Sequence, residues 1–186
     1  MSDAVFLPGD RVDLRPIERE DLEFLQAAIN DPAVRRNLTV RWPLNYDQEE
    51  EWFEEQVTSE ENINLLIVGE DGPAGAIGLG PIDNQNGTAE LGIWLQAADQ
   101  GNGYGTEAST LLLDHAFDEL RLHRIEARVF EGNDASLRSQ LPVPALPAAL
   151  GAFGVACVTP HADFGPEEAV LDGEVLCHTP PYCEEG

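Results

Sequence analysis

The pattern of apolar and polar residues predicts β-strands in four segments of this chain. The segment 11–17 alternates through Val12 and Leu14 and ends near Pro16, where a proline removes a backbone donor and a strand stops. The other segments span 63–68, 74–80 and 88–95, and short Asp-Gly-Pro and Asn-rich turn sequences separate them. Strands that follow one another across short turns predict an antiparallel meander.

Helical spacing of apolar residues marks three further segments. One begins near Glu20 and ends before Pro32, and a second follows Asp47, a candidate N-cap with Glu50 three residues later. The third starts at Gly105, and the segment 124–130 after it reads as a buried strand. The stretch 88–130 is therefore predicted to be a strand-helix-strand unit, with parallel strands joined by a right-handed crossover.

The pattern ends after Arg138. Seven prolines interrupt the last 48 residues, which hold seven acidic residues and no basic one, and we expect no helix or strand there. The predicted fold is a three-layer mixture of helices and strands, α+β or α/β. Its mixed central sheet is an antiparallel meander followed by the parallel unit. We assign residues 1–138 to one core domain and 139–186 to an atypical Pro-rich acidic tail, disordered or produced by a disrupted reading frame.

Charge excludes one class of function. The 186 residues include 35 acidic and 10 basic ones, all of the latter arginine, for a net charge of −25. No basic stripe exists to neutralise phosphates, so a nucleic-acid surface is excluded. A folded chain of this charge suits concentrated salt, where screening is strong, so we expect the cytoplasm of a halophile.

The sequence favours a soluble protein that does not bind membranes. It has neither a secretory signal nor an apolar run long enough to span a bilayer. Its three cysteines, Cys157, Cys177 and Cys183, form an odd set that fits a reducing compartment.

The sequence QGNGYG at 100–105, called here the glycine loop, carries the strongest chemical signal. It lies between a predicted strand and a predicted helix, and glycine occupies every second position. Successive N–H groups at the positive end of a helix dipole form a nest for an anion such as a diphosphate. A tight structural turn is the alternative interpretation. The loop lacks the Gly-Lys-Ser/Thr ending of a nucleoside-triphosphate loop, and the strand before it belongs to a meander.

The loop resembles motif A of the GCN5-related N-acetyltransferase (GNAT) superfamily, Gln/Arg-x-x-Gly-x-Gly/Ala, with Gln100, Gly103 and Gly105 in the fixed positions. The segments RVDLRPIEREDLEFL, AELGIWL, GNGYGTEA and IEARVFEGNDAS are similar to the branch that acetylates the amino termini of ribosomal proteins and to its relatives acting on other amines. The resemblance covers residues 10–138. It implies that acetyl-CoA donates an acetyl group to a primary amine by direct attack, without a covalent enzyme intermediate.

The resemblance also implies residue roles. Backbone N–H groups of 100–105 bind the pyrophosphate, the strand 91–95 pairs with the pantetheine, and an N–H near Ile93 or Trp94 polarises the thioester carbonyl. Asn133 contacts the pantetheine, and Ser136 protonates the departing thiolate, although ordinary turn and capping roles explain both equally. The implied cofactor-binding residues are Leu91, Ile93, Trp94, Gln100, Gly101, Asn102, Gly103, Tyr104, Gly105, Thr106 and Asn133.

The amine needs a base, and Glu90 is the candidate. Alternation places Glu90, Gly92 and Trp94 on one face of their strand, although a solvated carboxylate is the alternative. Three aromatic residues, Trp42, Tyr46 and Trp52, either line the amine site or belong to the core.

Two other groups of residues are assigned no chemistry. His115 and His123 flank the end of the long helix and are expected to be surface or packing residues. Cysteines and histidines of the tail match no strong zinc pattern, so no metal is expected; they are Cys157, His161, Cys177, His178 and Cys183.

The tail departs from the family, whose members continue with a helix and two strands that help form the acceptor site. Pro142 and Pro144 interrupt that helix. One hypothesis is that the reading frame is disrupted after residue 138, and resequencing that finds the same uninterrupted frame would refute it. Two functions remain: an active amine acetyltransferase, acting on a peptide amino terminus or a small amine, and a non-catalytic CoA-binding domain. A monomer or a homodimer is compatible with either.

Overall fold

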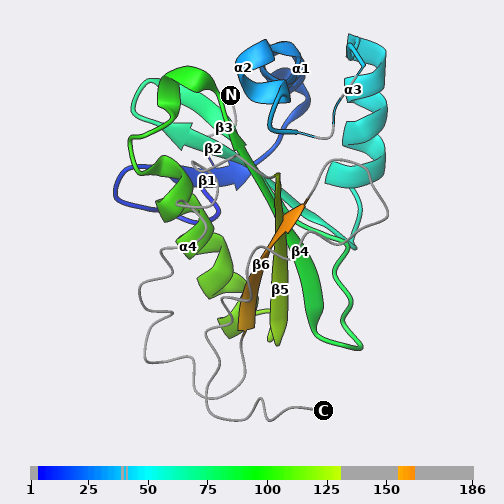
Figure 1. Ribbon diagram of the computed structural model, residues 1–186, viewed down its shortest axis with the longest axis vertical. Coiled ribbons are helices and arrows are strands. Elements are labelled where there is room, and N and C mark those ends of the chain that lie inside the picture. The colour runs from blue at the N-terminus through cyan, green and yellow to red at the C-terminus, as the bar shows by residue number, and fades with distance from the viewer. Residues whose placement is uncertain (1–3, 39, 41, 131–154, 162–186) are drawn as a thin grey trace.

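The computed structural model describes residues 4–38, 40, 42–130 and 155–161 (Figure 1). Six strands form one sheet in the order β1-β2-β3-β4-β5-β6. Neighbours from β1 to β4 pair antiparallel, whereas β4–β5 and β5–β6 pair parallel. The meander and the parallel strand pair predicted from the sequence are therefore confirmed. The strands are β1 (Asp13–Pro16), β2 (Ile63–Gly69), β3 (Gly72–Leu79), β4 (Thr88–Leu95), β5 (Arg124–Phe130) and β6 (Val155–His161).

Along the chain, one group of helices connects β1 to β2, and a second group connects the parallel strands β4 and β5. The first group is the 3-10 turn η1 (Arg19–Asp21), α1 (Leu22–Asn30), α2 (Pro32–Arg35), α3 (Tyr46–Trp52) and its π-helical continuation η2 (Phe53–Val57). After β4 come the 3-10 turn η3 (Ala97–Asp99) and the long helix α4 (Tyr104–Asp118). Among the described residues, no helix has the length and apolar character needed to cross a membrane.

Two apolar clusters cover the two faces of the sheet. One joins α4 to one face and includes Leu65, Ile67 and Leu112. The other joins α1 and η2 to the opposite face and includes Leu25, Phe53 and Leu66. Neighbouring residues of β2 point to opposite sides, so Leu65 and Leu66 belong to different clusters. The predicted three-layer arrangement follows from this alternation (Figure 1).

A buried ion pair joins β1 to the helices above it. Arg15 donates two hydrogen bonds to the carboxylate of Asp21, at 2.8 and 2.7 Å, and both residues are buried. Asp21 also accepts the backbone N–H of Glu18 at 2.8 Å. The bonded Asp21 carboxylate raises the pKa of Arg15. A bidentate geometry with a further backbone donor is what a buried pair needs to offset its desolvation.

Three expectations about elements were wrong. The second predicted helix is capped by Asn45, whose side chain accepts the N–H of Gln48 at 2.9 Å, and not by Asp47. The short helix α2 begins at Pro32, where we expected only a stop, because proline is compatible with the first helical position. The tail, in which we expected no element, contributes β6 at the edge of the sheet, the position that tolerates Pro160.

Candidate functional site

Strands β4 and β5 pair over only part of their length. The register runs from Thr88 and Arg124 to Leu91 and Ala127, whereas β4 continues to Leu95. Figure 1 shows the two strands parting toward the glycine loop. Four residues of β4 are thus left with an edge that β5 no longer occupies.

The direction of the backbone groups along this edge follows from the hydrogen bonds at the two ends of β4. Gly80 N–H donates to the carbonyl of Glu90, and Gln96 N–H donates to the carbonyl of Ala74. Even-numbered residues of β4 therefore face β3, and the N–H groups of the odd-numbered residues Ile93 and Leu95 face the side that β5 has left. Of the two donors considered for the thioester carbonyl, the geometry favours Ile93.

The glycine loop connects this edge to α4. Gly101 and Gly103 both have φ of +83°, in the left-handed region that glycine adopts without strain, and Gly103 occupies the N-cap position of α4. The side chain of Gln100 donates to the carbonyl of Leu95 at 3.0 Å, which ties the loop to the end of β4. The loop thus presents main-chain donors at the N-terminus of a 15-residue helix.

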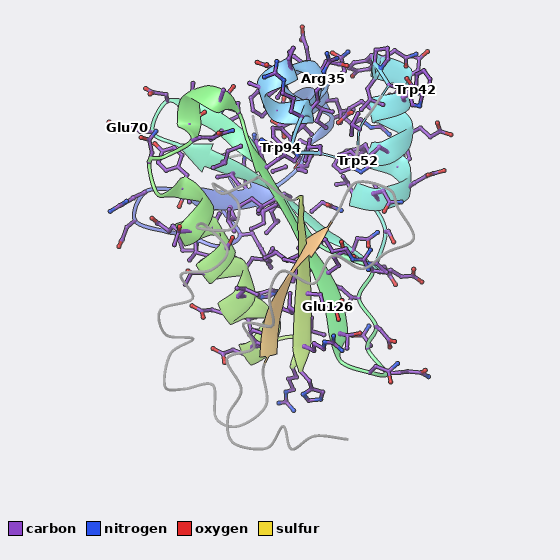
Figure 2. All side chains as sticks on the ribbon, in the orientation of Figure 1. Arg35, Trp42, Trp52, Glu70, Trp94 and Glu126 are labelled. Carbon is purple, nitrogen blue, oxygen red and sulfur yellow. The ribbon has the colours of Figure 1, made fainter. Side chains whose placement is uncertain are left out.

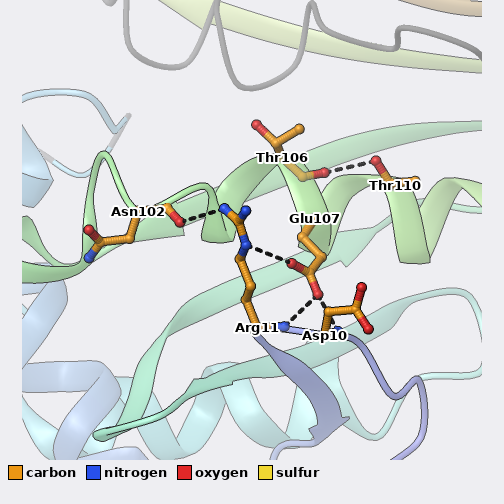
Figure 3. A network of polar contacts seen from close by, with 6 residues as sticks. All are labelled: Asp10, Arg11, Asn102, Thr106, Glu107 and Thr110. Carbon is orange, nitrogen blue, oxygen red and sulfur yellow. Dashed lines mark hydrogen bonds and ion pairs between the residues drawn. The ribbon is translucent and has the colours of Figure 1, made fainter.

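An arginine and a glutamate fix the loop from the other side (Figure 3). Arg11 donates from Nη1 to the carbonyl of Asn102 at 3.2 Å. Glu107, in the first turn of α4, accepts the backbone N–H groups of Asp10 and Arg11 at 2.5 and 2.8 Å. The segment that leads into β1 is therefore attached to the loop and to the helix that follows it.

A cavity of about 300 Å³, called here the β4 cavity, opens on the face of the sheet that carries α1 and α3. Its floor includes Gly92, Ile93 and Trp94, the stretch of β4 that does not pair with β5. The remaining lining residues are Leu38, Trp52, Gln56, Asn62, Asn64, Ala76, Ile77, Gly78, Leu79, Gly80 and Glu90. An added Cβ at Gly92 would meet nothing within 4 Å, so the missing side chain leaves the floor open.

Three amide side chains on one wall of the β4 cavity hold one another in place. Asn62 donates to the side-chain oxygen of Gln56 at 3.1 Å, and Asn64 donates to the main-chain oxygen of Gln56 at 3.0 Å. Gly78 and Gly80 give these amides room, since a Cβ at Gly78 would lie 2.6 Å from Asn64 Oδ1. Asn62 and Asn64 each use one N–H donor within the wall, and their side-chain oxygens are acceptors of the kind that suits a cationic ligand.

Glu90 and Trp94 have the orientation predicted from alternation. Leu91 and Ile93 pack in the cluster beneath α4, whereas Trp94 packs in the other cluster and stacks on Phe24 with ring centroids 6.3 Å apart. Glu90 lines the β4 cavity, and its Oε2 lies 3.4 Å from Arg128 Nη2. The site therefore combines a carboxylate, amide oxygens and the aromatic side chains of Trp52 and Trp94, a combination suited to a cation.

The other two aromatic candidates, Trp42 and Tyr46, lie on the surface and not in the β4 cavity. Trp42 is 82% exposed and Tyr46 47% exposed, so neither belongs to the core. Figure 2 shows Trp42 at the far end of α3 from Trp52. Neither residue lines the β4 cavity.

The packing interpretation of His115 is confirmed. Its ring is buried and meets Phe6 edge-on, with centroids 5.0 Å apart. Asn133 and Ser136 lie outside the described residues, as do Cys177, His178 and Cys183, and the side chains of β6 are not described. Within the described ranges, no group of three or more His, Cys, Asp or Glu residues is placed to hold a metal ion.

Sequence reasoning missed Arg11 and the three cavity amides. Arg11 acts through a partner 91 residues away, and the two cavity asparagines bond to Gln56 across a turn at spacings of six and eight residues that match no known motif. It also missed Glu49, which is 2% exposed in α3 and has an Oε1 atom without a hydrogen-bond partner among the described residues. Burial raises the pKa of Glu49 to about 7. A signal was available, because Glu49 lies three residues before Trp52 on the inner face of a short helix.

Comparison with known proteins supplies the family. The model of the acetyltransferase (GNAT) domain matches residues 11–139. The uncharacterized N-acetyltransferase p20 of Bacillus licheniformis is 31% identical over 134 residues, which cover 69% of this chain and 75% of that protein. Spermidine N(1)-acetyltransferase of Escherichia coli (strain K12) is 25% identical over 126 residues, 68% of each chain.

A solved structure shows the same fold. It is spermidine N-acetyltransferase from Vibrio cholerae in complex with CoA and spermine, which has a TM-score of 0.58 and 23% identity. The match covers 63% of this chain and 70% of that one. At this identity the likeness is one of fold, and it agrees with the mixed sheet and the two helical layers described above.

Proposed function

The chain belongs to the GNAT acetyltransferase family and is an acyl-CoA N-acyltransferase, and on that premise we propose that it acetylates a primary amine held in the β4 cavity. One observation carries the proposal. The floor of the cavity is the same stretch of β4, Gly92 to Trp94, whose edge β5 leaves open. An acyl donor along that edge and an amine in the cavity would meet at Ile93.

Each substrate has groups that suit its charge. The CoA diphosphate is bound by main-chain N–H groups of the glycine loop, and the pantetheine lies along the edge from Leu91 to Leu95. The ammonium form of the amine lies among Glu90, the amide oxygens and the tryptophan side chains. The names of two similar proteins, which act on spermidine, agree with a cationic substrate.

The chemistry then follows in one transfer. Glu90 takes a proton from the ammonium, directly or through water, and the free amine attacks the thioester carbon. A C–N bond forms, the N–H of Ile93 stabilises the oxyanion, and the C–S bond breaks. The nitrogen then loses its second proton, which balances the proton taken up by the thiolate of CoA; the family resemblance suggests Ser136 as the donor to the thiolate, and an acetamide is released.

The experiment supplies acetyl-CoA with a panel of polyamines, small primary amines and peptides that have free amino termini. Thiol release is followed with time, and mass spectrometry identifies the acetylated product. Calorimetry with acetyl-CoA runs in parallel. Turnover with any member supports the proposal and names the amine. Binding of acetyl-CoA without turnover on any amine contradicts it and favours the non-catalytic CoA-binding function.

A substitution at Gly92 tests the place of the amine. Gly92→Leu puts a side chain into the open floor, and we expect the KM of the amine to rise about tenfold or more, as overpacking by a few methylenes does. The Kd of acetyl-CoA should stay unchanged, because the strand edge and the glycine loop are untouched. Gly92→Ala is the matched control and should change the KM little. An unchanged KM in Gly92→Leu places the amine elsewhere.

A further inference from the structure

Arg11 reaches the glycine loop from 91 residues away in the sequence. Its side chain donates to the carbonyl of Asn102, its backbone N–H donates to Glu107, and its Nε lies 4.0 Å from Glu107 Oε2 (Figure 3). Arg11 is thus attached to the loop by its side chain and to the first turn of α4 by its main chain.

The guanidinium group lies directly against Gly103. A Cβ added at Gly103 would come within 2.5 Å of Arg11 Nη1, whereas a Cβ at Gly101 would meet nothing within 4 Å. The two glycines have the same φ of +83° and so share the same backbone requirement. Glycine is needed at position 103 for a second reason, because a side chain there would collide with the guanidinium group of Arg11.

Peptide planarity links this contact to the anion nest. In a trans peptide the carbonyl of one residue and the N–H of the next point in opposite directions. A charged donor that holds the Asn102 carbonyl therefore also fixes the direction of the Gly103 N–H, a donor at the helix N-terminus. The side chain of Arg11 is 63% exposed, so it is free to act on the potential around the loop.

We propose that Arg11 is a positioning residue for the acyl donor: it turns the Asn102–Gly103 peptide so that the Gly103 N–H faces the CoA diphosphate. Its positive charge also offsets locally the repulsion between the phosphates and a protein of net charge −25. The inference rests on the proposed function, because it takes the glycine loop as the diphosphate site.

The test compares two acyl donors. Acetyl-CoA carries the diphosphate, and S-acetyl-pantetheine lacks it. In Arg11→Met, which keeps the aliphatic stem, we expect kcat/KM for acetyl-CoA to fall about tenfold, the order contributed by a hydrogen bond to a charged group. The value for S-acetyl-pantetheine should not change. Arg11→Lys should recover part of the loss, and Arg124→Met, at another half-exposed arginine with an ion pair, should affect neither donor.

A second comparison uses the two glycines. Gly103→Ala should weaken acetyl-CoA binding more than Gly101→Ala does. When each glycine variant also carries Arg11→Ala, the two should bind acetyl-CoA with equal affinity. Equal losses with the two donors in Arg11→Met, or no loss with either, overturn the positioning role. Calorimetry on the wild-type protein tests the proposed function separately. If the wild-type protein fails to bind acetyl-CoA, the proposed function itself is overturned.

Discussion

Burial of Glu49 predicts that one substitution stabilises the protein at high pH. Glu49 is 2% exposed, its Oε1 has no hydrogen-bond partner among the described residues, and burial raises its pKa from 4.5 to about 7. A carboxylate in such a place is costly when ionised, because little compensates for its lost hydration. Glu49→Gln keeps the shape of the side chain and removes the ionisation.

The sign and size follow from proton binding. Below pH 4.5 the carboxyl is protonated in both states, so the group makes no pH-dependent contribution. Between pH 4.5 and about 7 the unfolded chain releases the proton and the folded chain keeps it, so stability falls as the pH rises. At about 1.36 kcal/mol for each pKa unit, the loss is about 3 kcal/mol and is complete above pH 7.

Urea unfolding followed by tryptophan fluorescence measures this difference at constant ionic strength. We expect the stability of Glu49→Gln, relative to wild type, to rise by about 3 kcal/mol between pH 4 and pH 8.5. Using the difference removes the contribution of the other carboxylates, which both proteins share. Glu51→Gln, at an exposed position of the same helix, should give a flat difference. A flat difference for Glu49→Gln as well would refute the reasoning.

Two further predictions concern the base and the core. Glu90→Gln should lower kcat by about 10² or more with an unchanged Kd for acetyl-CoA, as loss of a general base does. The control is Glu126→Gln, at the residue of β5 that pairs with Glu90, and it should keep full activity. Full activity in Glu90→Gln and a loss in Glu126→Gln would assign the base elsewhere. Leu112→Ala, at a fully buried position of α4, should lower the free energy of unfolding by about 2–5 kcal/mol in the same urea assay, and a loss below 1 kcal/mol would show that the site collapses around the smaller residue.

Elements that depend on local pattern were predictable from the sequence. Strand β4 and strand β5 have the predicted bounds, and α4 begins one residue before the predicted start. These segments have one apolar face against a continuous core, so their periodicity reports their burial. The parallel pairing of β4 with β5 followed from the helix between them.

Features that depend on tertiary context were not predictable. Strand β6 lies in a Pro-rich segment, and its pairing with β5 uses main-chain groups that carry no sequence signal. The cap at Asn45 was missed because Asp47 offered an equally good local pattern two residues later. Asn and Asp cap helices about equally well, so local preference does not choose between the two positions and tertiary contacts decide.

The candidate site divides in the same way. The glycine loop is contiguous, so its place between β4 and the N-terminus of α4 was predictable from six residues. Arg11, by contrast, is brought to it by the pairing of β1 with β2 and by the packing of α4 on the sheet. The wall of amides needs β2 and β3 in a register that places Asn64 beside Gly78. No spacing rule specifies either contact before the topology is known.

In the proposed reaction, strand β4 resolves the conflict between the opposite charges of the two substrates. Its edge offers N–H groups toward the acyl donor, and its face offers Glu90 and the space above Gly92 to the amine. Because backbone groups and side chains of a strand point along perpendicular directions, one strand presents both sets of groups. A chain of net charge −25 can then bind an anionic donor through main-chain donors and one positioned arginine, while its carboxylates remain available to the cation. The acidity of the protein and the chemistry proposed for it are therefore compatible.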